Sequence, residues 1–359
     1  MNMAFERDNI LSMSGYVPGE QPTESNVIKL NTNENPYPAS PRVTEALTAI
    51  NIEELRRYPS PTASRFRQTA ADYHGLSDYN ILPTNGGDEL LRLAITTFAD
   101  PGETIGIAVP SYSLYPVLTE IQGCKLVSIP LLDDWNLPAN FADRLNGAGA
   151  KLALLVNPHA PSGILTGAEQ IIDIANSFEG VLLIDEAYVD FVDPENEYDL
   201  APEVEQLDNI LLLRTLSKGF SLAGLRFGYG MGPKTIIEPM MYKTRDSYNT
   251  DHISQQLATA ALESADYARQ TWSKVRSERL LLTEELQKLG LTCPPSQSNF
   301  LLAQAENEET AGDIVKRLKR ENILIRYFDE DRLRDKLRIT VGNPEQNQHL
   351  LDCLKSIIS

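Results

Sequence analysis

Between residues 80 and 232 the sequence alternates short runs rich in valine, isoleucine and leucine with helical or mixed segments, and few folds accommodate this pattern. Several runs are nearly continuous in apolar residues, which is typical of strands covered on both faces. The alternation predicts an α/β fold with a mostly parallel sheet between helices. The predicted strands are Asn80–Thr84, Thr104–Val109, Lys125–Leu131, Lys151–Val156, Gly180–Ile184, Asn209–Leu213 and Arg226–Gly230.

The segments around these strands suggest how the chain is divided. Apolar stripes at helical spacing predict helices at Asp88–Phe98 and Ala168–Ser177. After about residue 250, long polar-rich helices such as Ser264–Leu289 precede a short αβ pattern. Near the start, the prolines of N-T-N-E-N-P-Y-P-A-S-P exclude a helix interior or a central strand and predict a loop. We expect an N-terminal arm with part of a smaller lobe at 1–45, a large domain at 46–250 and a small α+β domain at 251–359.

Composition excludes several classes of function. The formal net charge of −18, with no cluster of lysine or arginine, argues against nucleic-acid binding. The three cysteines and four histidines are scattered without ligand spacing, so we predict neither a metal site nor a disulfide framework. No run of about 18 apolar residues is available to span a membrane. The polar N-terminus M-N-M-A-F-E-R-D-N-I does not resemble a secretory signal, so we expect a cytoplasmic protein.

Ligands of open α/β sheets bind at the carboxyl ends of the strands, so the residues after each strand are candidates for chemistry. The first strand is followed by N-G-G-D-E, Asn85 to Glu89, directly before a helix. Glycines let a ligand approach the backbone, and the free N–H groups of a helix N-terminus attract anions. Gly87 and Asp88 therefore belong either to a phosphate site or to a plain turn in which Asp88 caps the helix.

A second strand, Gly180–Ile184, is followed by D-E-A-Y, which places Asp185 and Tyr188 at its apolar end. A carboxylate in such a place needs a partner, because burying an unpaired charge costs several kcal/mol. The partner of Asp185 is either the protonated ring nitrogen of a ligand or an arginine of the same chain.

A third strand leads into R-T-L-S-K-G-F-S-L-A-G-L-R-F-G, which starts at Arg214. Lys218 is either a solvated surface residue or a desolvated amine, made nucleophilic by Arg214 and Arg226, that forms a Schiff base. Ser217 and Arg226 would bind a phosphate dianion together with the Gly86–Gly87 turn. A lysine, an acid and an anion site at three strand ends of one sheet are the groups that pyridoxal 5′-phosphate requires.

Together with three further motifs, these stretches resemble the fold-type I aminotransferases, and most of all the histidinol-phosphate aminotransferases among them. The resemblance extends from about Leu30 to Gly342. The motifs that carry it are S-K-G-F-S-L-A-G-L-R-F-G-Y, D-E-A-Y, N-P-H-A-P-S-G, L-N-T-N-E-N-P and L-R-I-T-V-G. The resemblance implies a large lobe with a mostly parallel sheet and a smaller α+β lobe. It also implies transamination between histidinol phosphate and 2-oxoglutarate, which gives imidazole-acetol phosphate and glutamate.

The resemblance further implies a role for each residue of the cofactor site. Lys218 would bind the cofactor covalently and carry the reacting proton, while Asp185 would keep the ring nitrogen protonated. Tyr188 would donate a hydrogen bond to the phenolic oxygen of the ring, and Tyr112 would stack on the ring face. The cofactor phosphate would be bound by Gly87, Asp88, Ser217, Arg226 and, from the second subunit of a homodimer, Tyr58.

Substrate contacts follow from the same resemblance. Arg338, in L-R-I-T-V-G, would bind the α-carboxylate of glutamate through two parallel hydrogen bonds. Arg326 and Tyr16 match positions that help to hold histidinol phosphate. The alternative for Arg326 is an exposed charge of little consequence.

One position departs from the family pattern. Relatives often have N-P-x-N-P-T-G, whose second asparagine donates to the phenolic oxygen of the cofactor, whereas this chain has Ala160 there. Either Asn157 or a water replaces that donor, or Tyr188 alone serves the oxygen. The change is expected to alter the pKa of the bound cofactor.

Two other functions are compatible with the sequence. The first is another fold-type I enzyme, either an aromatic or general amino-acid aminotransferase, which would respond to phenylalanine or aspartate, or a threonine-phosphate decarboxylase, which would release carbon dioxide. The second is a non-catalytic sensor, because this fold also occurs as the effector domain of transcription regulators. Those regulators carry a basic DNA-binding segment, which the acidic composition argues against.

Overall fold

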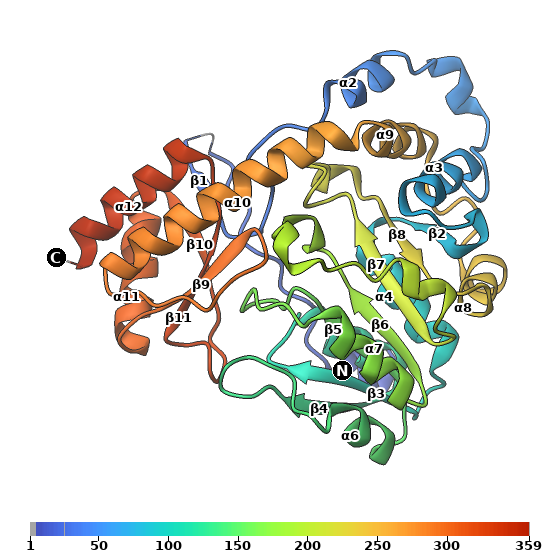
Figure 1. Cartoon of the computed structure of the whole chain (residues 1–359), viewed down its shortest axis with the longest axis horizontal. Coiled ribbons are helices and arrows are strands. Elements are labelled where there is room, and N and C mark those ends of the chain that lie inside the picture. Colours follow the sequence, from blue (N-terminus) through green and yellow to red (C-terminus); the bar gives the residue numbers. More distant parts are fainter. Residues whose placement is uncertain (1–4, 25, 359) are drawn as a thin grey trace.

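The computed structural model describes residues 5–24 and 26–358, which form a large and a small lobe (Figure 1). Within these residues the large lobe contains a seven-stranded sheet of order β2-β8-β7-β6-β5-β3-β4. The neighbouring strands β7, β6, β5, β3 and β4 all pair in parallel, while β8 is antiparallel to both β2 and β7. The prediction of an α/β fold with a mostly parallel sheet is confirmed. The strands are β2 Ile81–Thr84, β3 Thr104–Val109, β4 Lys125–Pro130, β5 Ala150–Val156, β6 Val181–Asp185, β7 Ile210–Thr215 and β8 Gly228–Met231.

Helices cover both faces of this sheet, which explains why the strand runs are continuously apolar. In β6, Leu182 and Ile184 pack in one core with α7, whereas Leu183 packs in the opposite core with α4 and α5. Successive side chains of a strand alternate between faces, so a strand between two helical layers must be apolar throughout. The helices are α1 Asp8–Ser12, α2 Pro41–Thr48, α3 Ser64–His74, α4 Gly86–Phe98, α5 Leu114–Gln122, α6 Phe141–Gly147, α7 Ala168–Ser177, α8 Lys234–Pro239, α9 His252–Glu263, α10 Ala265–Lys288, α11 Glu308–Arg320 and α12 Pro344–Ile358.

The small lobe contains a sheet of order β1-β10-β11-β9 with α11, α12 and the end of the long helix α10 beside it (Figure 1). Its strands are β1 Ile28–Leu30, β9 Phe300–Gln304, β10 Ile323–Tyr327 and β11 Lys336–Thr340. β1 pairs in parallel with β10, so the N-terminal part of the chain belongs to the sheet of the C-terminal lobe. The domain boundaries at residues 45 and 250 stay a prediction; α9, just past the second boundary, packs against α2 and α3.

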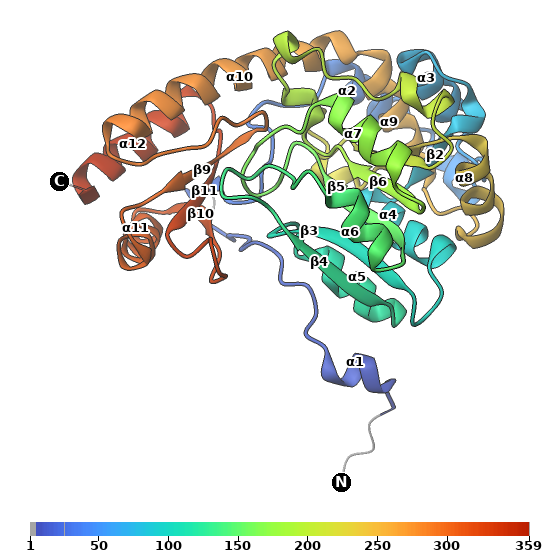
Figure 2. The same ribbon diagram turned by 60° about the horizontal axis from the view of Figure 1, so that its bottom comes forward.

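Residues 31–40 form neither helix nor strand, as the prolines and asparagines predict, and the chain enters α2 at Pro41. This position suits proline, because the first N–H of a helix has no partner within it. Further toward the N-terminus, α1 projects beyond the large lobe beside α5 (Figure 2).

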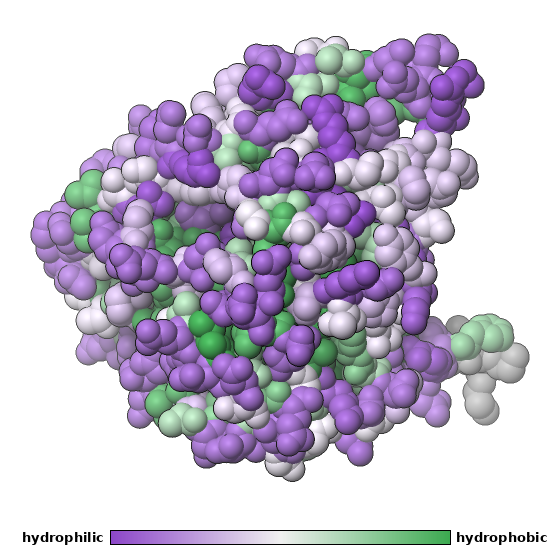
Figure 3. Space-filling model, turned by 45° about the vertical axis from the view of Figure 1, so that its right-hand side comes forward, coloured by the Kyte–Doolittle hydropathy of each residue, from purple (hydrophilic) through white to green (hydrophobic). Residues whose placement is uncertain are grey.

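The surface is polar over most of the face shown in Figure 3, with apolar residues in small groups. Such a surface is expected of a chain with a net charge of −18. Among the described residues, no helix combines the length and the apolar character needed to cross a membrane.

Candidate active site

The carboxyl ends of β6 and β7 and the N-terminus of α4 open into a cavity of about 440 Å³ that residues of both lobes line. Its volume falls within the usual range for a small-molecule site. The structure places every site residue predicted from sequence in its wall, except Tyr58. Those residues are Tyr16, Gly87, Asp88, Tyr112, Asp185, Tyr188, Ser217, Lys218, Arg226, Arg326 and Arg338.

Lys218 follows β7 and points its amine into the cavity, where Nζ donates a hydrogen bond to the carbonyl oxygen of Thr32 at 2.7 Å. Burial, and then the charge of Arg338, lower the pKa of Lys218 to about 8, with a smaller contribution from Arg226. The sequence also predicts that Arg214 makes the Lys218 amine nucleophilic. In the structure Arg214 instead forms an ion pair with Glu186 at 2.6 Å. Lys218 is therefore the desolvated amine of the two alternatives, not a solvated surface lysine.

Asp185 is the last residue of β6, and its side chain is buried. Its carboxylate accepts a hydrogen bond from the Tyr115 hydroxyl at 2.9 Å and another from the Ala187 backbone N–H at 3.1 Å. Burial raises the pKa of Asp185 to about 6.

The partners of Asp185 decide between the two readings of D-E-A-Y. Within residues 5–24 and 26–358, no lysine, arginine or histidine forms an ion pair with Asp185, while the neighbouring Glu186 pairs with Arg214. The alternative of a salt bridge to an arginine of the same chain is thus wrong. A buried carboxylate with only neutral partners is suited to receive a cationic group from a ligand.

The anion end of the cavity lies at the start of α4. Gly86 has a φ of +77°, and a Cβ there would lie 2.6 Å from Nη2 of Arg226. The helix starts before Asp88, so Asp88 is not its cap, and its carboxylate instead pairs with Arg226 at 3.3 Å. Asn85, which occupies the cap position, makes no side-chain capping bond. The first-turn N–H groups, beside Arg226 and the buried Ser217, therefore form a site that fits a phosphate.

Two arginines from neighbouring strands of the small lobe also line the cavity. Arg326 on β10 lies opposite Arg338 on β11, and both guanidinium groups lie 5.3 Å from the ring centre of Phe328. Nη2 of Arg338 donates to the Asn31 carbonyl at 2.9 Å, whereas its buried Nε has no hydrogen-bond partner in the described part of the chain. A buried donor without a partner is costly, so this geometry favours an anionic ligand at Arg338.

Two aromatic residues extend the same wall. Tyr16 meets the ring of Tyr112 edge to face, with ring centres 5.7 Å apart.

Tyr58, in contrast, lies outside the cavity: it is 80% exposed and stacks on Tyr248 with a centroid distance of 4.4 Å. A residue that reaches the site only from a second subunit would be exposed in one chain in this way.

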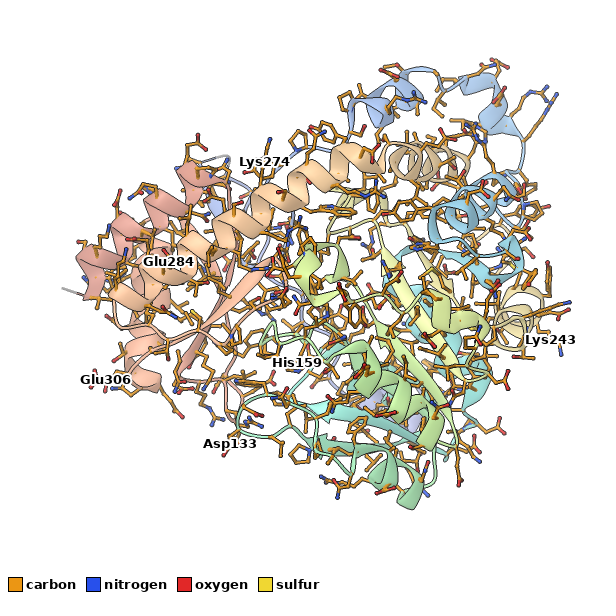
Figure 4. All side chains as sticks on the ribbon, viewed as in Figure 1. Asp133, His159, Lys243, Lys274, Glu284 and Glu306 are labelled. Carbon is orange, nitrogen blue, oxygen red and sulfur yellow. The ribbon has the colours of Figure 1, made fainter. Side chains whose placement is uncertain are left out.

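The motif N-P-H-A-P-S-G contributes structure more than chemistry. His159 is buried in the large lobe (Figure 4), where Nε2 donates to the Pro110 carbonyl at 2.8 Å and Nδ1 accepts from Ser162 Oγ at 2.7 Å. Burial lowers its pKa to about 4, so the ring is neutral at pH 7. The amide of Asn157 is bonded through both of its polar atoms to the backbone of Thr166, at 2.8 and 3.0 Å. Asn157 also forms a side-chain hydrogen bond with Tyr198 and is not among the residues that line the cavity, so it does not supply the donor that Ala160 lacks.

Sequence reasoning missed two residues that contact the predicted site. Tyr115 binds Asp185, and Asn33 donates to the Tyr188 hydroxyl at 3.0 Å. Tyr115 had a usable signal, because it follows Tyr112 by three residues and so falls on the same side of the turn that starts α5. Asn33 lies in the motif L-N-T-N-E-N-P, but nothing local indicates that its side chain turns inward.

Comparisons with known proteins identify the family to which the chain belongs. The family model for aminotransferase class I and II matches residues 25–354. Histidinol-phosphate aminotransferase 1 of Trichormus variabilis is 40% identical over 355 residues, which are 99% of each chain. The histidinol-phosphate aminotransferase of Geotalea uraniireducens is 40% identical over 352 residues, 98% of this chain and 99% of that protein.

Solved structures show the same fold. The histidinol-phosphate aminotransferase from Sinorhizobium meliloti, in complex with pyridoxal-5′-phosphate, gives a TM-score of 0.91 at 24% identity and covers 99% of this chain and 98% of its own. The L-threonine-O-3-phosphate decarboxylase from Porphyromonas gingivalis gives 0.80 at 22% identity over 92% of this chain and 99% of its own. The family resemblance drawn from the motifs is confirmed over nearly the full length: the chain belongs to the aminotransferase class I and II family.

Proposed function

We propose that this chain is a pyridoxal-phosphate-dependent aminotransferase that interconverts histidinol phosphate and 2-oxoglutarate with imidazole-acetol phosphate and glutamate, a step of histidine biosynthesis. The observation that carries the proposal is the juxtaposition of two groups in one cavity. Lys218 there has a pKa of about 8, and Asp185 is buried without a cationic partner among the residues that the structure describes. Lysine and acid of this kind are what the cofactor requires.

Each residue around the cavity would have its own role in binding the cofactor or in moving a proton. When bound, pyridoxal phosphate withdraws electrons from the substrate carbon that carries the amine. Asp185 would hold the proton of the cofactor ring nitrogen, and Lys218 would bind the cofactor and then accept and return the proton of the substrate carbon. The phosphate would be held by the first-turn N–H groups of α4 at Gly87 and Asp88, with Ser217 and Arg226. Tyr112 would pack on the ring face.

Substrate recognition would use the two arginines of β10 and β11. Both halves of the reaction involve an anion: the carboxylate of glutamate in one and the phosphate of histidinol phosphate in the other. Arg338 offers an Nε that has no partner within residues 5–24 and 26–358, and Arg326 lies beside it across the strand pair. A guanidinium binds either anion through parallel N–H donors, so the same pair would serve both substrates. Tyr16 would close the wall next to Tyr112.

The identity of the relatives favours histidinol phosphate over the other substrates. The fold alone does not separate the candidates, because a threonine-phosphate decarboxylase shares it with a TM-score of 0.80. The 40% identity to histidinol-phosphate aminotransferases over 99% of the chain supports the assignment. A cytoplasmic location stays a prediction.

The experiment that tests the function is a half-reaction of the purified enzyme loaded with pyridoxal phosphate. Histidinol phosphate, added without any keto acid, is expected to convert the bound cofactor to its amine form, followed by the loss of visible absorbance. Phenylalanine and threonine phosphate, in parallel, are expected to react at least about a hundredfold more slowly, because phenylalanine lacks the phosphate group of histidinol phosphate and threonine phosphate lacks its imidazole ring. A fast response to phenylalanine alone, or carbon dioxide released from threonine phosphate, would assign the chain to one of the alternative activities.

We further propose a homodimer in which Tyr58 reaches the phosphate site of the other subunit. The support is its exposure together with that of other apolar side chains on α2 and the turn after it: Leu47, Ile52 and Leu55. Exposed apolar residues gathered in this way are typical of an interface. Sedimentation should give twice the 39.9 kDa of one chain, and a species of 39.9 kDa at micromolar concentration would contradict the proposal.

Gly86→Ala is expected to weaken the binding of pyridoxal phosphate by about 10- to 100-fold, the loss of one charge-assisted hydrogen bond. The added Cβ would lie 2.6 Å from Nη2 of Arg226 and push the guanidinium away from the start of α4. Gly75→Ala is the matched control, because Gly75 has a similar φ of +69° but open space around it. Spectrophotometric titration of the cofactor-free proteins with pyridoxal phosphate measures both. Equal affinities in the two variants would show that backbone strain, not the phosphate site, is responsible.

A further inference from the structure

Asn33 lies in segment 31–40, where the chain passes between the lobes, and its side chain is 1% exposed. Its backbone takes a φ of 58°, a left-handed conformation that asparagine tolerates better than most residues. Two contacts hold the backbone of Asn33. Asn299 Nδ2 donates to the backbone carbonyl of Asn33 at 2.9 Å, and the backbone N–H of Asn33 donates to Thr340 Oγ1 at 3.0 Å. Thr340 Oγ1 in turn lies 3.1 Å from Asn33 Oδ1.

These contacts determine which way the amide of Asn33 points. The Thr340 hydroxyl accepts the Asn33 N–H, so its single proton is left to donate to Oδ1 of the same residue. Nδ2 is then the atom that faces Tyr188, and it donates to the Tyr188 hydroxyl oxygen at 3.0 Å. A chain of donors thus runs from Thr340 on β11, through Asn33, to Tyr188 in the large lobe.

The consequence concerns the one proton of the Tyr188 hydroxyl. Because the oxygen accepts from Asn33, the proton does not point there, and Tyr188 lines the cavity. Burial raises the pKa of Tyr188, so the hydroxyl keeps its proton at neutral pH. Asn33 therefore leaves Tyr188 as a hydrogen-bond donor directed at whatever the cavity binds.

This donor matters because position 160 contributes none. Ala160 lines the cavity with a methyl group, and the nearby amide of Asn157 is bonded to the backbone of Thr166. We propose that Asn33 is a positioning residue that fixes Tyr188 as the donor to the phenolic oxygen of bound pyridoxal phosphate, an oxygen to which Ala160 offers no second donor. The inference rests on the proposed function.

The test measures the pH at which the visible absorbance of bound pyridoxal phosphate changes. A donor to the phenolic oxygen stabilises its ionised form, so the cofactor loses its proton at a lower pH when the donor is aligned. Asn33→Ala is expected to raise the midpoint by about one pH unit. Tyr188→Phe should raise it at least as much, and the double variant should show no further increase, because both changes remove the same interaction.

A rescue variant tests whether a donor at position 160 compensates for the loss of Asn33. Ala160→Asn, introduced into Asn33→Ala, supplies a new donor and should return the midpoint to within about a third of a unit of the original value. Asn80→Ala is the matched control: it removes another buried amide, bonded to the Gly232 carbonyl at 2.9 Å, with no contact to Tyr188. Its midpoint should equal that of the unchanged protein.

Several results would overturn the inference. They are an unchanged midpoint in Asn33→Ala, shifts that add in the double variant, or no response to Ala160→Asn. If Asn33→Ala does not fold, Thr340→Val removes the hydroxyl that orients the amide and must raise the midpoint in the same direction. Failure of the proposed function would look different: histidinol phosphate would then leave the absorbance of the cofactor-loaded, unchanged protein as it was, whatever the midpoint in Asn33→Ala.

Discussion

Lys218→Ala should lower the rate of the half-reaction with histidinol phosphate by about a thousandfold or more, the loss expected when one group is both nucleophile and proton carrier. Lys218→Arg should be equally slow, because a guanidinium keeps the charge but stays protonated. Lys274→Ala, an exposed lysine on α10 (Figure 4), is the control and should react at the original rate. Stopped-flow absorbance measures all of them. A Lys218→Arg variant that retains most of the rate would reduce the role of Lys218 to its charge.

The pKa of about 8 adds a pH dependence to this prediction. Only the uncharged amine attacks a carbonyl, and this form dominates above the pKa. Capture of pyridoxal phosphate by the cofactor-free protein should therefore accelerate with rising pH and level off above about pH 8. Capture that accelerates up to the ordinary lysine value of 10.5 would show that burial and Arg338 do not act on Lys218 as the structure indicates.

Asp185→Asn is expected to have opposite effects on activity and on stability. The amide has nearly the shape of the carboxylate but cannot hold a proton on the ring nitrogen of the cofactor. The rate of the half-reaction should fall by about 10²- to 10⁴-fold, the usual contribution of a positioned acid or base.

The stability of the cofactor-free protein should instead rise. Folding raises the pKa of Asp185 from 3.8 to about 6, so the carboxyl group stabilises the folded state fully only below pH 3.8, and this stability is lost as the pH rises through 6. At pH 8 the buried charge therefore costs on the order of 3 kcal/mol, which the neutral amide avoids. Urea unfolding at pH 8 should show the gain, and at pH 5 the gain should be smaller.

The neighbouring acid gives a matched control for this second prediction. Burial also raises the pKa of Glu186, but Glu186→Gln should lower the free energy of unfolding, since it leaves the largely buried Arg214 without its ionic partner. Two adjacent acids are thus expected to respond with opposite signs. A loss of stability in both variants at pH 8 would mean that Asp185 is held by its neutral partners more strongly than its raised pKa implies.

The elements of the large lobe were predictable because each depends on a local pattern. The apolar runs that become β5, β6 and β7 differ from the predicted ranges by one or two residues at the ends. The candidate site followed from the same information, since parallel strands place the residues after them on one edge of the sheet. Lys218, Asp185 and Gly87 were found in this way, and they meet in one cavity.

Contacts between distant parts of the chain were not predictable. Asn33 and Tyr188 are 155 residues apart, and Tyr115 and Asp185 are 70 apart, so no spacing in the sequence relates them. The effect of Arg338 on Lys218 depends likewise on how the small lobe sits over the large one. The sequence also does not indicate which of the adjacent acids Asp185 and Glu186 pairs with Arg214; in the folded chain it is Glu186.

The parallel pairing of β1 with β10 constrains how the protein matures during synthesis. Ile28 pairs with Ile323 and Leu30 with Ile325, so the strand made first must wait for one of the last to leave the ribosome. Until then Thr32 and Asn33 have no fixed place beside Lys218 and Tyr188. Contacts of such long range close slowly, after local structure has formed. All strands of the large-lobe sheet precede residue 232, so we expect this sheet to form on the nascent chain before the catalytic site is complete, and cofactor capture to follow translation.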